Sequence, residues 1–192
     1  MKYGKHLVAA ALALTAFLAF AGVASATTVT SPAGTAFTGT IKATSTDTKL
    51  TNSATIGTVS CEHSEVEGLV TSHGGASTAF GDITKLTFTK CSGGEPTSPV
   101  TTRGTLEVHL TTAPDGTATS NGASVTVHKT LVGTCTFITK NTDIGTFLGG
   151  TPAHLAIGSS PIPQSSGNFF CPSSATWTGN YTVTSPGTLL VS

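Results

Sequence analysis

Threonine alternates with apolar residues along several short segments of this chain, and this alternation restricts the fold more than any other feature. The pattern is clearest in 105–111, where Leu106, Val108 and Leu110 alternate with polar residues. A period of two places every second side chain on the same face of a β-strand, so the segment predicts a strand with one buried and one solvated face. The other predicted strands are 36–44, 123–130 and 176–184, with weaker signals at 83–89, 131–139, 155–157 and 189–191.

Turn residues separate these segments, and the composition favours sheet over helix. Threonine is the dominant residue, with 38 copies after position 26, whereas Glu, Lys, Leu and Gln are few. Many short strands joined by Gly, Pro and Asn turns predict an all-β fold, an antiparallel β-sandwich or barrel. The segment 158–168 contains Pro161, Pro163 and Gly167, and we expect it to form a long loop.

Residues 1–26 have the features of a secretory signal peptide. A basic start at Lys2 and Lys5 precedes an apolar run over 7–23, and Ala24-Ser25-Ala26 provides the small residues of a cleavage site. We therefore expect residues 27–192 to form a single all-β domain that is secreted, either free outside the cell or associated with the cell wall. The sequence has no cysteine at the cleavage site and no apolar tail, so we expect no surface anchor.

The cysteines are expected to form two disulfides. All four, Cys61, Cys91, Cys135 and Cys171, follow the signal segment, and an even number in an exported chain is typical of disulfide pairing. Three pairings are possible. We favour Cys61–Cys91 and Cys135–Cys171, because each closes one local loop. A zinc site is the alternative, but the chain has no C-x-x-C motif and its cysteines are widely spaced.

The low charge of the chain argues against two classes of partner. Without Lys2 and Lys5 the chain has seven basic and nine acidic residues, and Arg103 is the only arginine. Nucleic acids and anionic membranes are both bound through basic patches, and no such patch is evident. We therefore expect no nucleic-acid partner, and no membrane partner after cleavage of the signal.

The sequence contains none of the common catalytic or cofactor motifs. G-x-S-x-G, H-E-x-x-H, the P-loop and G-x-G-x-x-G are all absent, and we expect no cofactor. A non-catalytic role is therefore favoured. A hydrolase that uses a pair of carboxylates remains the alternative, because such pairs are recognised by their separation in space and not by sequence.

A metal-binding surface is a further alternative, with Glu107, His109 and His128 as its ligands. These residues lie on the polar faces of the predicted strands 105–111 and 123–130. If the two strands form a hairpin, Glu107 or His109 lies across from His128. Two imidazoles and a carboxylate on one face suit Zn²⁺ or Cu²⁺, although an ordinary solvated sheet face has the same composition.

Two other groups of residues have competing interpretations. His63, Glu65 and Glu67 would share one face of a strand, where they could hold Ca²⁺ or act as acid and base; a charged, solvated edge strand is the favoured interpretation. Trp177 and Tyr181 can stack on a sugar, but they share a face with apolar Val183, which favours burial.

Three segments of the chain resemble parts of known secreted proteins. They are the start Thr27-Thr28-Val29-Thr30-Ser31-Pro32-Ala33-Gly34, the segment between Cys61 and Cys91, and the ending from Trp177 to Gly187. The chain resembles uncharacterised secreted, threonine-rich β proteins of high-GC Gram-positive bacteria. That resemblance implies no activity and transfers no site residues. The expected role is non-catalytic binding or structural support at the cell surface, with cell-wall or extracellular polysaccharide as the expected partner.

Overall fold

The computed structural model describes residues 26–32, 34–52, 56–72, 78–97 and 104–192, so all of the signal segment except Ala26 lies outside the described residues. Every regular secondary-structure element in the described part of the chain is a β-strand. They are β1 (Val29–Thr30), β2 (Thr40–Ser45), β3 (Thr48–Asn52), β4 (Gly57–Ser72), β5 (Thr78–Ser92), β6 (Glu95–Thr97), β7 (Thr105–Thr112), β8 (Asp115–Asn121), β9 (Ser124–Lys129), β10 (Gly133–Ile138), β11 (Thr142–Leu148), β12 (His154–Gly167), β13 (Ser174–Ser185) and β14 (Leu190–Val191). Within the described residues no helix is long and apolar enough to cross a membrane.

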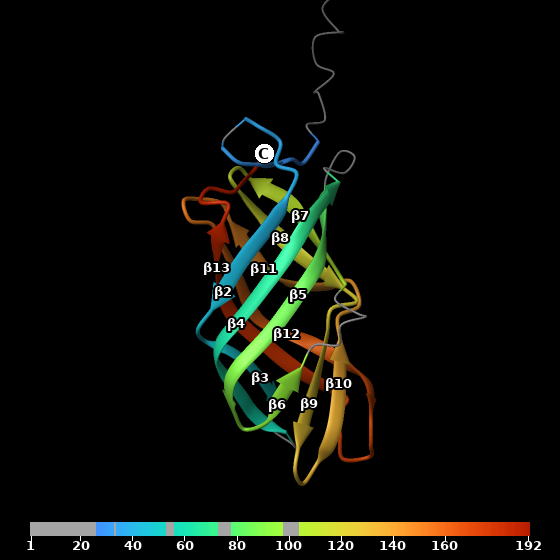
Figure 1. Cartoon of the computed structure of the whole chain (residues 1–192). Helices are drawn as coiled ribbons and strands as arrows, with labels where there is room; N and C mark the ends of the chain where they lie inside the picture. The colour runs from blue at the N-terminus through green and yellow to red at the C-terminus, as the bar shows by residue number, and fades with distance from the viewer. Residues whose placement is uncertain (1–25, 33, 53–55, 73–77, 98–103) are drawn as a thin grey trace, which may run out of the picture.

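The strands form a meander that closes into a barrel. We use "lane" for one line of chain along the barrel, which holds one long strand or two shorter ones end to end. In sequence order the lanes are β2–β3, β4, β5, β6–β7, β8–β9, β10–β11, β12 and β13, and each pairs antiparallel with the next. The last lane then pairs with the first, through β13 with β2 and β3. Of the two predicted architectures, the structure is the barrel, and it is elongated (Figure 1).

The first lane shows how two strands make one line. Thr40 lies opposite Leu69, and Asn52 lies opposite Gly57, with no change of register between them. The chain bends between β2 and β3, at Thr46, and the carboxylate of the next residue, Asp47, takes the place of a backbone partner for Asn180. Its oxygens accept hydrogen bonds from the backbone N–H and the side-chain amide of Asn180, at 3.1 and 3.2 Å.

The barrel interior contains two cores, one toward each end. The first core comprises Val29, Ala43, Ala79, Val108, Ala118, Ile144, Phe147, Ala153, Ile157, Tyr181, Val183, Leu189 and Val191. The second comprises Leu50, Ile56, Val59, Cys61, Val125, Val127, Val132, Cys135, Phe137, Ile162, Cys171 and Ala175. Trp177 packs against both cores and so joins them.

A buried polar cluster lies next to Trp177. The hydroxyl of Tyr181 is 2.9 Å from that of Ser64 and accepts a hydrogen bond from the Thr48 hydroxyl at 3.4 Å. Tyr181 and Ser64 are 1% and 0% exposed, so the cluster has no access to water. Burial raises the pKa of the Tyr181 phenol, because the charged form would lose its solvation.

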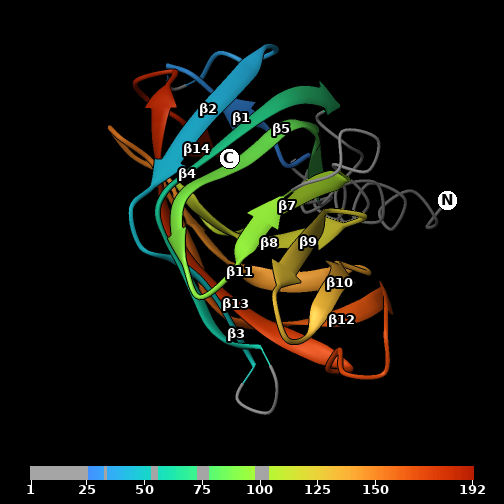
Figure 2. The same cartoon turned by 60° about the horizontal axis from the view of Figure 1, so that its bottom comes forward.

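Strands β1 and β14 pair with each other and close one end of the barrel, which we call the cap end. Val29 lies opposite Val191, and the backbone of Thr28 exchanges hydrogen bonds with that of Ser192. Val29, Leu189 and Val191 are buried in the first core. The two-stranded cap thus covers the apolar interior with residues from both ends of the described chain. Figure 2 brings the opposite end of the barrel forward, with β1 and β14 behind it.

The predicted disulfide pairing is confirmed. Cys61 and Cys91 lie directly opposite each other on β4 and β5, and they are joined by a disulfide. The second disulfide joins Cys135 of β10 to Cys171, which lies in the connection between β12 and β13. Both sulfur bridges belong to the second core.

The prediction of a long loop over 158–168 is wrong, because β12 continues through it to Gly167. Pro161 and Pro163 lie opposite Thr176 and Ser174 of β13. The backbone N–H of Gln164 points toward β13 and donates a hydrogen bond there. The backbone nitrogens of Pro161 and Pro163, which alternate with it, therefore point toward the other neighbouring lane. That lane pairs with β12 only at 154–157 and 164–167, so the two prolines remove no ladder hydrogen bond.

We predict that Tyr181→Phe lowers the free energy of unfolding by about 1–3 kcal/mol, since it leaves the buried Ser64 and Thr48 hydroxyls without this partner. Urea unfolding monitored by circular dichroism measures the change. The double variant Tyr181→Phe/Ser64→Ala should be more stable than Tyr181→Phe alone, because it removes an unpaired hydroxyl. Equal stability of wild type and Tyr181→Phe would contradict a satisfied buried cluster.

The same tyrosine predicts a loss of stability at high pH. The unfolded phenol releases its proton near its ordinary pKa of 10.0, whereas the folded phenol releases it only at higher pH. The unfolded state therefore binds fewer protons in this range, and stability falls as the pH rises above about 10. Urea titrations at several pH values should show a smaller fall for Tyr181→Phe than for wild type.

Candidate functional site

The residues of the expected metal site lie on strands that do not pair with each other. Glu107 and His109 are on β7, which pairs with β5 and β8, whereas His128 is on β9, which pairs with β10 and β6. The expected hairpin between the two strands is therefore wrong. The strand β8 lies between them in sequence and forms the hairpin with β7.

The structure therefore does not bring the three proposed ligands together. Glu107 Oε2 and His109 Nε2 are 3.8 Å apart on the outer face of the barrel, and His128 is exposed farther along the neighbouring lane. Among the described residues, no group of three or more His, Cys, Asp or Glu side chains is arranged to hold a metal ion. Glu107 and His109 remain a close pair of partly exposed side chains without a third ligand.

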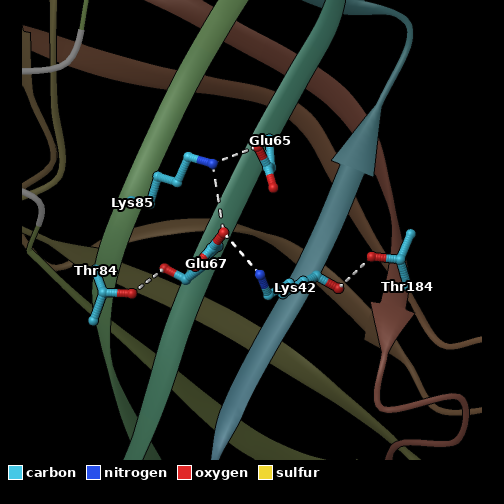
Figure 3. Close-up of polar contacts among 6 residues, drawn as sticks. All are labelled: Lys42, Glu65, Glu67, Thr84, Lys85 and Thr184. Atoms are coloured by element: carbon cyan, nitrogen blue, oxygen red, sulfur yellow. Dashed lines mark hydrogen bonds and ion pairs between the residues drawn. The ribbon is translucent and has the colours of Figure 1, made fainter.

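His63, Glu65 and Glu67 share the outer face of β4, as their spacing predicts. The expectation that this is an edge strand is wrong, since β4 pairs with β2–β3 on one side and with β5 on the other. Lysines of the neighbouring lanes neutralise the two glutamates (Figure 3). Lys85 Nζ lies 2.7 Å from Glu65 and 3.5 Å from Glu67, and Lys42 Nζ lies 3.2 Å from Glu67.

These ion pairs shift the pKa values of Glu67 and Lys85. The hydrogen bond from Lys42, followed by the attraction of Lys42 and Lys85, holds the pKa of Glu67 below its usual range. The hydrogen bond to Glu65 is the main cause of the raised pKa of Lys85. A general acid needs a raised carboxyl pKa, so Glu67 has the opposite shift from the one that acid catalysis requires. The arrangement is a charge ladder across three lanes, with exposed side chains that contribute little to stability.

Tyr181 is not available for sugar stacking, because it is 1% exposed. Its ring meets that of Trp177 edge to face, with centroids 6.4 Å apart and planes at 86°. Both rings belong to the barrel interior, where Trp177 contacts the two cores. The burial favoured by the alternation with Val183 is therefore confirmed for Tyr181.

The feature that the sequence interpretation missed is a cavity of about 100 Å³ beneath the cap. We call it the capped cavity. Every lane except β8–β9 contributes to its lining, together with the cap. The lining residues are Val29, Ile41, Ala43, Val66, Gly68, Leu69, Val70, Ala79, Phe80, Gly81, Asp82, Ile83, Leu106, Val108, Phe147, Leu155, Val183, Leu189 and Val191.

Small residues on the inner face create this space. Gly68 of β4 and Gly81 of β5 have no side chain to fill the interior, and Ala43 and Ala79 fill little of it. A run of such residues at inward positions is the sequence signal for the cavity. It is a weak signal, because glycine and alanine in strands are also common at bulges, such as the one between Glu67 and Gly68.

The chemistry of the lining favours an apolar occupant. Asp82 is the one titratable side chain among the lining residues, and it is exposed to solvent. A buried water needs two to four polar partners, and the remaining lining side chains offer none. The lining of the capped cavity therefore suits hydrocarbon groups better than water.

Comparison of the chain with protein-family models, with curated proteins and with solved structures finds no match.

We predict that Lys42→Met raises the pKa of Glu67 toward its ordinary value, because the largest cause of its lowering is removed. Carboxyl-carbon NMR titration measures the change at Glu67 directly. Lys90→Met is the matched control, since Lys90 pairs with Glu62 at 3.9 Å and not with Glu67. A carboxyl group whose pKa is lowered by folding stabilises the fold at pH values above its unfolded pKa, and this stabilisation is lost as the pH falls. Wild type should therefore lose more stability in acid than Lys42→Met. An unchanged Glu67 titration in Lys42→Met would contradict the charge ladder.

Proposed function

We propose that the protein is a non-catalytic binding protein that works outside the cytoplasm, and that its capped cavity takes one small apolar molecule. The observation that carries this proposal is the cavity itself. It lies beneath the cap, between the lanes of the barrel, and it is lined almost entirely by aliphatic and aromatic side chains. Ligand sites are usually concave and mostly apolar, and the mouths of barrels are common places for them.

The lining supports binding in preference to chemistry. It contains no hydroxyl, thiol or imidazole side chain that could act as nucleophile or base. The carboxylates Glu65 and Glu67 are on the outside of the barrel, and both pair with Lys85. These features favour the binding role over the alternative of a hydrolase.

The disulfides support a location outside the cytoplasm. Two bridges join all four cysteines, and structural disulfides persist in oxidising compartments. The signal segment at 1–26 supports the same location from sequence. A protein released from the cell or held at its wall is consistent with both observations.

The size of the cavity limits the ligand. An engineered cavity of about 150 Å³ in another protein stays dry and binds benzene. A space of about 100 Å³ therefore suits a hydrocarbon group of benzene size or slightly smaller. The ligand class we propose is a small aromatic or branched aliphatic molecule, or the end of a longer one.

We predict that toluene stabilises the protein with a saturable, one-to-one dependence. A ligand that binds only the folded state adds RT ln(1 + [L]/Kd) to the free energy of unfolding, about 2.7 kcal/mol at a hundredfold excess over Kd. Thermal unfolding at several toluene concentrations measures this, and phenol serves as the polar analogue that should bind less tightly. No saturable shift with any apolar probe would count against the proposal.

Variants that fill the space test whether the cavity is the site. Ala43→Val and Ala79→Val each add two carbon atoms to the lining and should abolish the toluene effect. Ala118→Val is the matched control, because Ala118 is buried in the same core but does not line the cavity. This control should still respond to toluene, even if overpacking lowers its stability. Solvent extraction of the secreted protein, followed by gas chromatography with mass spectrometry, then identifies the natural ligand.

A further inference from the structure

Three large apolar side chains project into solvent at the end of the barrel opposite the cap. Leu131, Phe169 and Phe170 are 91%, 96% and 60% exposed, and the other large exposed hydrophobic residues in the described chain, Leu69 and Leu148, are 41% and 42% exposed. We call these three residues the apolar tip. Leu131 lies in the turn between β9 and β10, and the two phenylalanines lie in the connection between β12 and β13, both at the lower end in Figure 1. Large exposed apolar groups gathered in one place mark interaction sites.

The two segments of the apolar tip are fixed to each other. The side-chain amide of Asn168 donates a hydrogen bond to the carbonyl of Val132 at 2.7 Å, which links the phenylalanine loop to the Leu131 turn. The disulfide from Cys135 to Cys171 fastens the far side of the same loop. Asn168 also accepts a hydrogen bond from the Phe170 N–H at 2.9 Å.

Because the loop is held in this way, the exposure of the phenylalanines is built into the fold. They are not on a loose segment that happens to face water. A preformed loop also loses less conformational entropy when it binds, which favours association.

The charge around the tip suits a lipid headgroup layer. The segments 129–133 and 167–173 contain no Asp or Glu, and Lys129 is their one charged residue. The Lys129 ammonium donates a hydrogen bond to the Ile56 carbonyl. Nothing in these segments repels phosphate groups, and nothing gives strong attraction to anionic lipids.

The size and shape of the tip disfavour two other occupants. A stable protein interface buries about 800 Å² and about 20–30 residues on each side, far more than three side chains supply. A sugar-binding platform needs rings that offer a flat face. The rings of Phe169 and Phe170 meet edge to face, at 76° and with centroids 5.7 Å apart. A fluid lipid interface needs neither a large matching surface nor a flat platform.

We propose that the apolar tip inserts into the headgroup region of a lipid membrane, with Phe169, Phe170 and Leu131 as its anchors. The expectation of no membrane partner rests on the shortage of basic residues, which bears on electrostatic attraction and not on apolar insertion. Binding through the tip is therefore independent of anionic lipid and of salt. It is also independent of the capped cavity, which lies at the other end.

Co-sedimentation of the secreted, oxidised protein with phosphatidylcholine vesicles tests this proposal. Wild type should bind, with no increase on adding phosphatidylglycerol and no loss in 0.5 M salt. Phe169→Ser/Phe170→Ser should lower the partition coefficient at least tenfold, since burial of one phenylalanine changes an equilibrium constant by about one to two decades. Leu148→Ser is the control, because Leu148 is a less exposed apolar residue on β11 outside the tip, and it should bind like wild type. Thermal unfolding confirms that both variants are folded.

A tryptophan placed in the tip gives a second measurement. Phe169→Trp should shift its fluorescence to shorter wavelength on vesicles and should be quenched by brominated lipid, while wild-type Trp177 is not. The proposal is overturned if wild type stays in the supernatant, or if Phe169→Ser/Phe170→Ser binds as well as wild type. Loss of self-association or of cell-wall binding in that variant, without vesicle binding by wild type, would assign the tip to a second copy or to polysaccharide. Ala43→Val should retain vesicle binding, which separates this proposal from that of the cavity.

Discussion

The pairing of the last lane with the first is the interaction on which the other features depend. Each remaining lane pairs with its neighbour in sequence, so those contacts are local hairpins. Among the lanes, only β13 must find a partner, β2–β3, across most of the chain, and the entropy of closing that loop opposes the contact. Asp47 and Asn180 strengthen the contact where the first lane bends. Without this pairing both lanes would be open edges, and neither core would be enclosed.

Closure also explains why the interior is divided. A barrel of this length has to be filled along its axis, and each core has its own large side chains, Phe147 and Tyr181 in the first and Phe137 in the second. Tyr181, Ser64 and Thr48 form a polar layer beside Trp177, where their hydroxyls satisfy one another. Beyond that layer, toward the cap, glycine and alanine replace larger residues and the capped cavity remains.

The sequence predicted most strands and the disulfides, because those depend on local pattern and on loop closure. The segments 105–111 and 176–184 lie within β7 and β13, since large apolar residues mark their inner faces. The alternation pattern did not predict strand β8, because its inner face carries only the small residues Gly116, Ala118 and Ser120. Without β8, strands β7 and β9 were expected to pair with each other.

The other features that the sequence did not predict depend on which segments are neighbours in the folded structure, and a single sequence does not reveal these neighbours. The prolines of β12 are tolerated because one side of that strand is unpaired at 158–163. The edge character expected for β4 failed because two lanes flank its charged face. The capped cavity depends on small residues from separate lanes that face one another. The apolar tip depends on a hydrogen bond from Asn168 to Val132 and on the disulfide between Cys135 and Cys171.

The cap has a consequence for how a molecule reaches the interior. Val29, Leu189 and Val191 line the capped cavity, and they belong to strands of two residues or to the turn beside them. Short terminal strands fray far more readily than the paired lanes of a barrel separate. Local opening of these few residues would therefore widen the access to the cavity while the barrel wall stays intact.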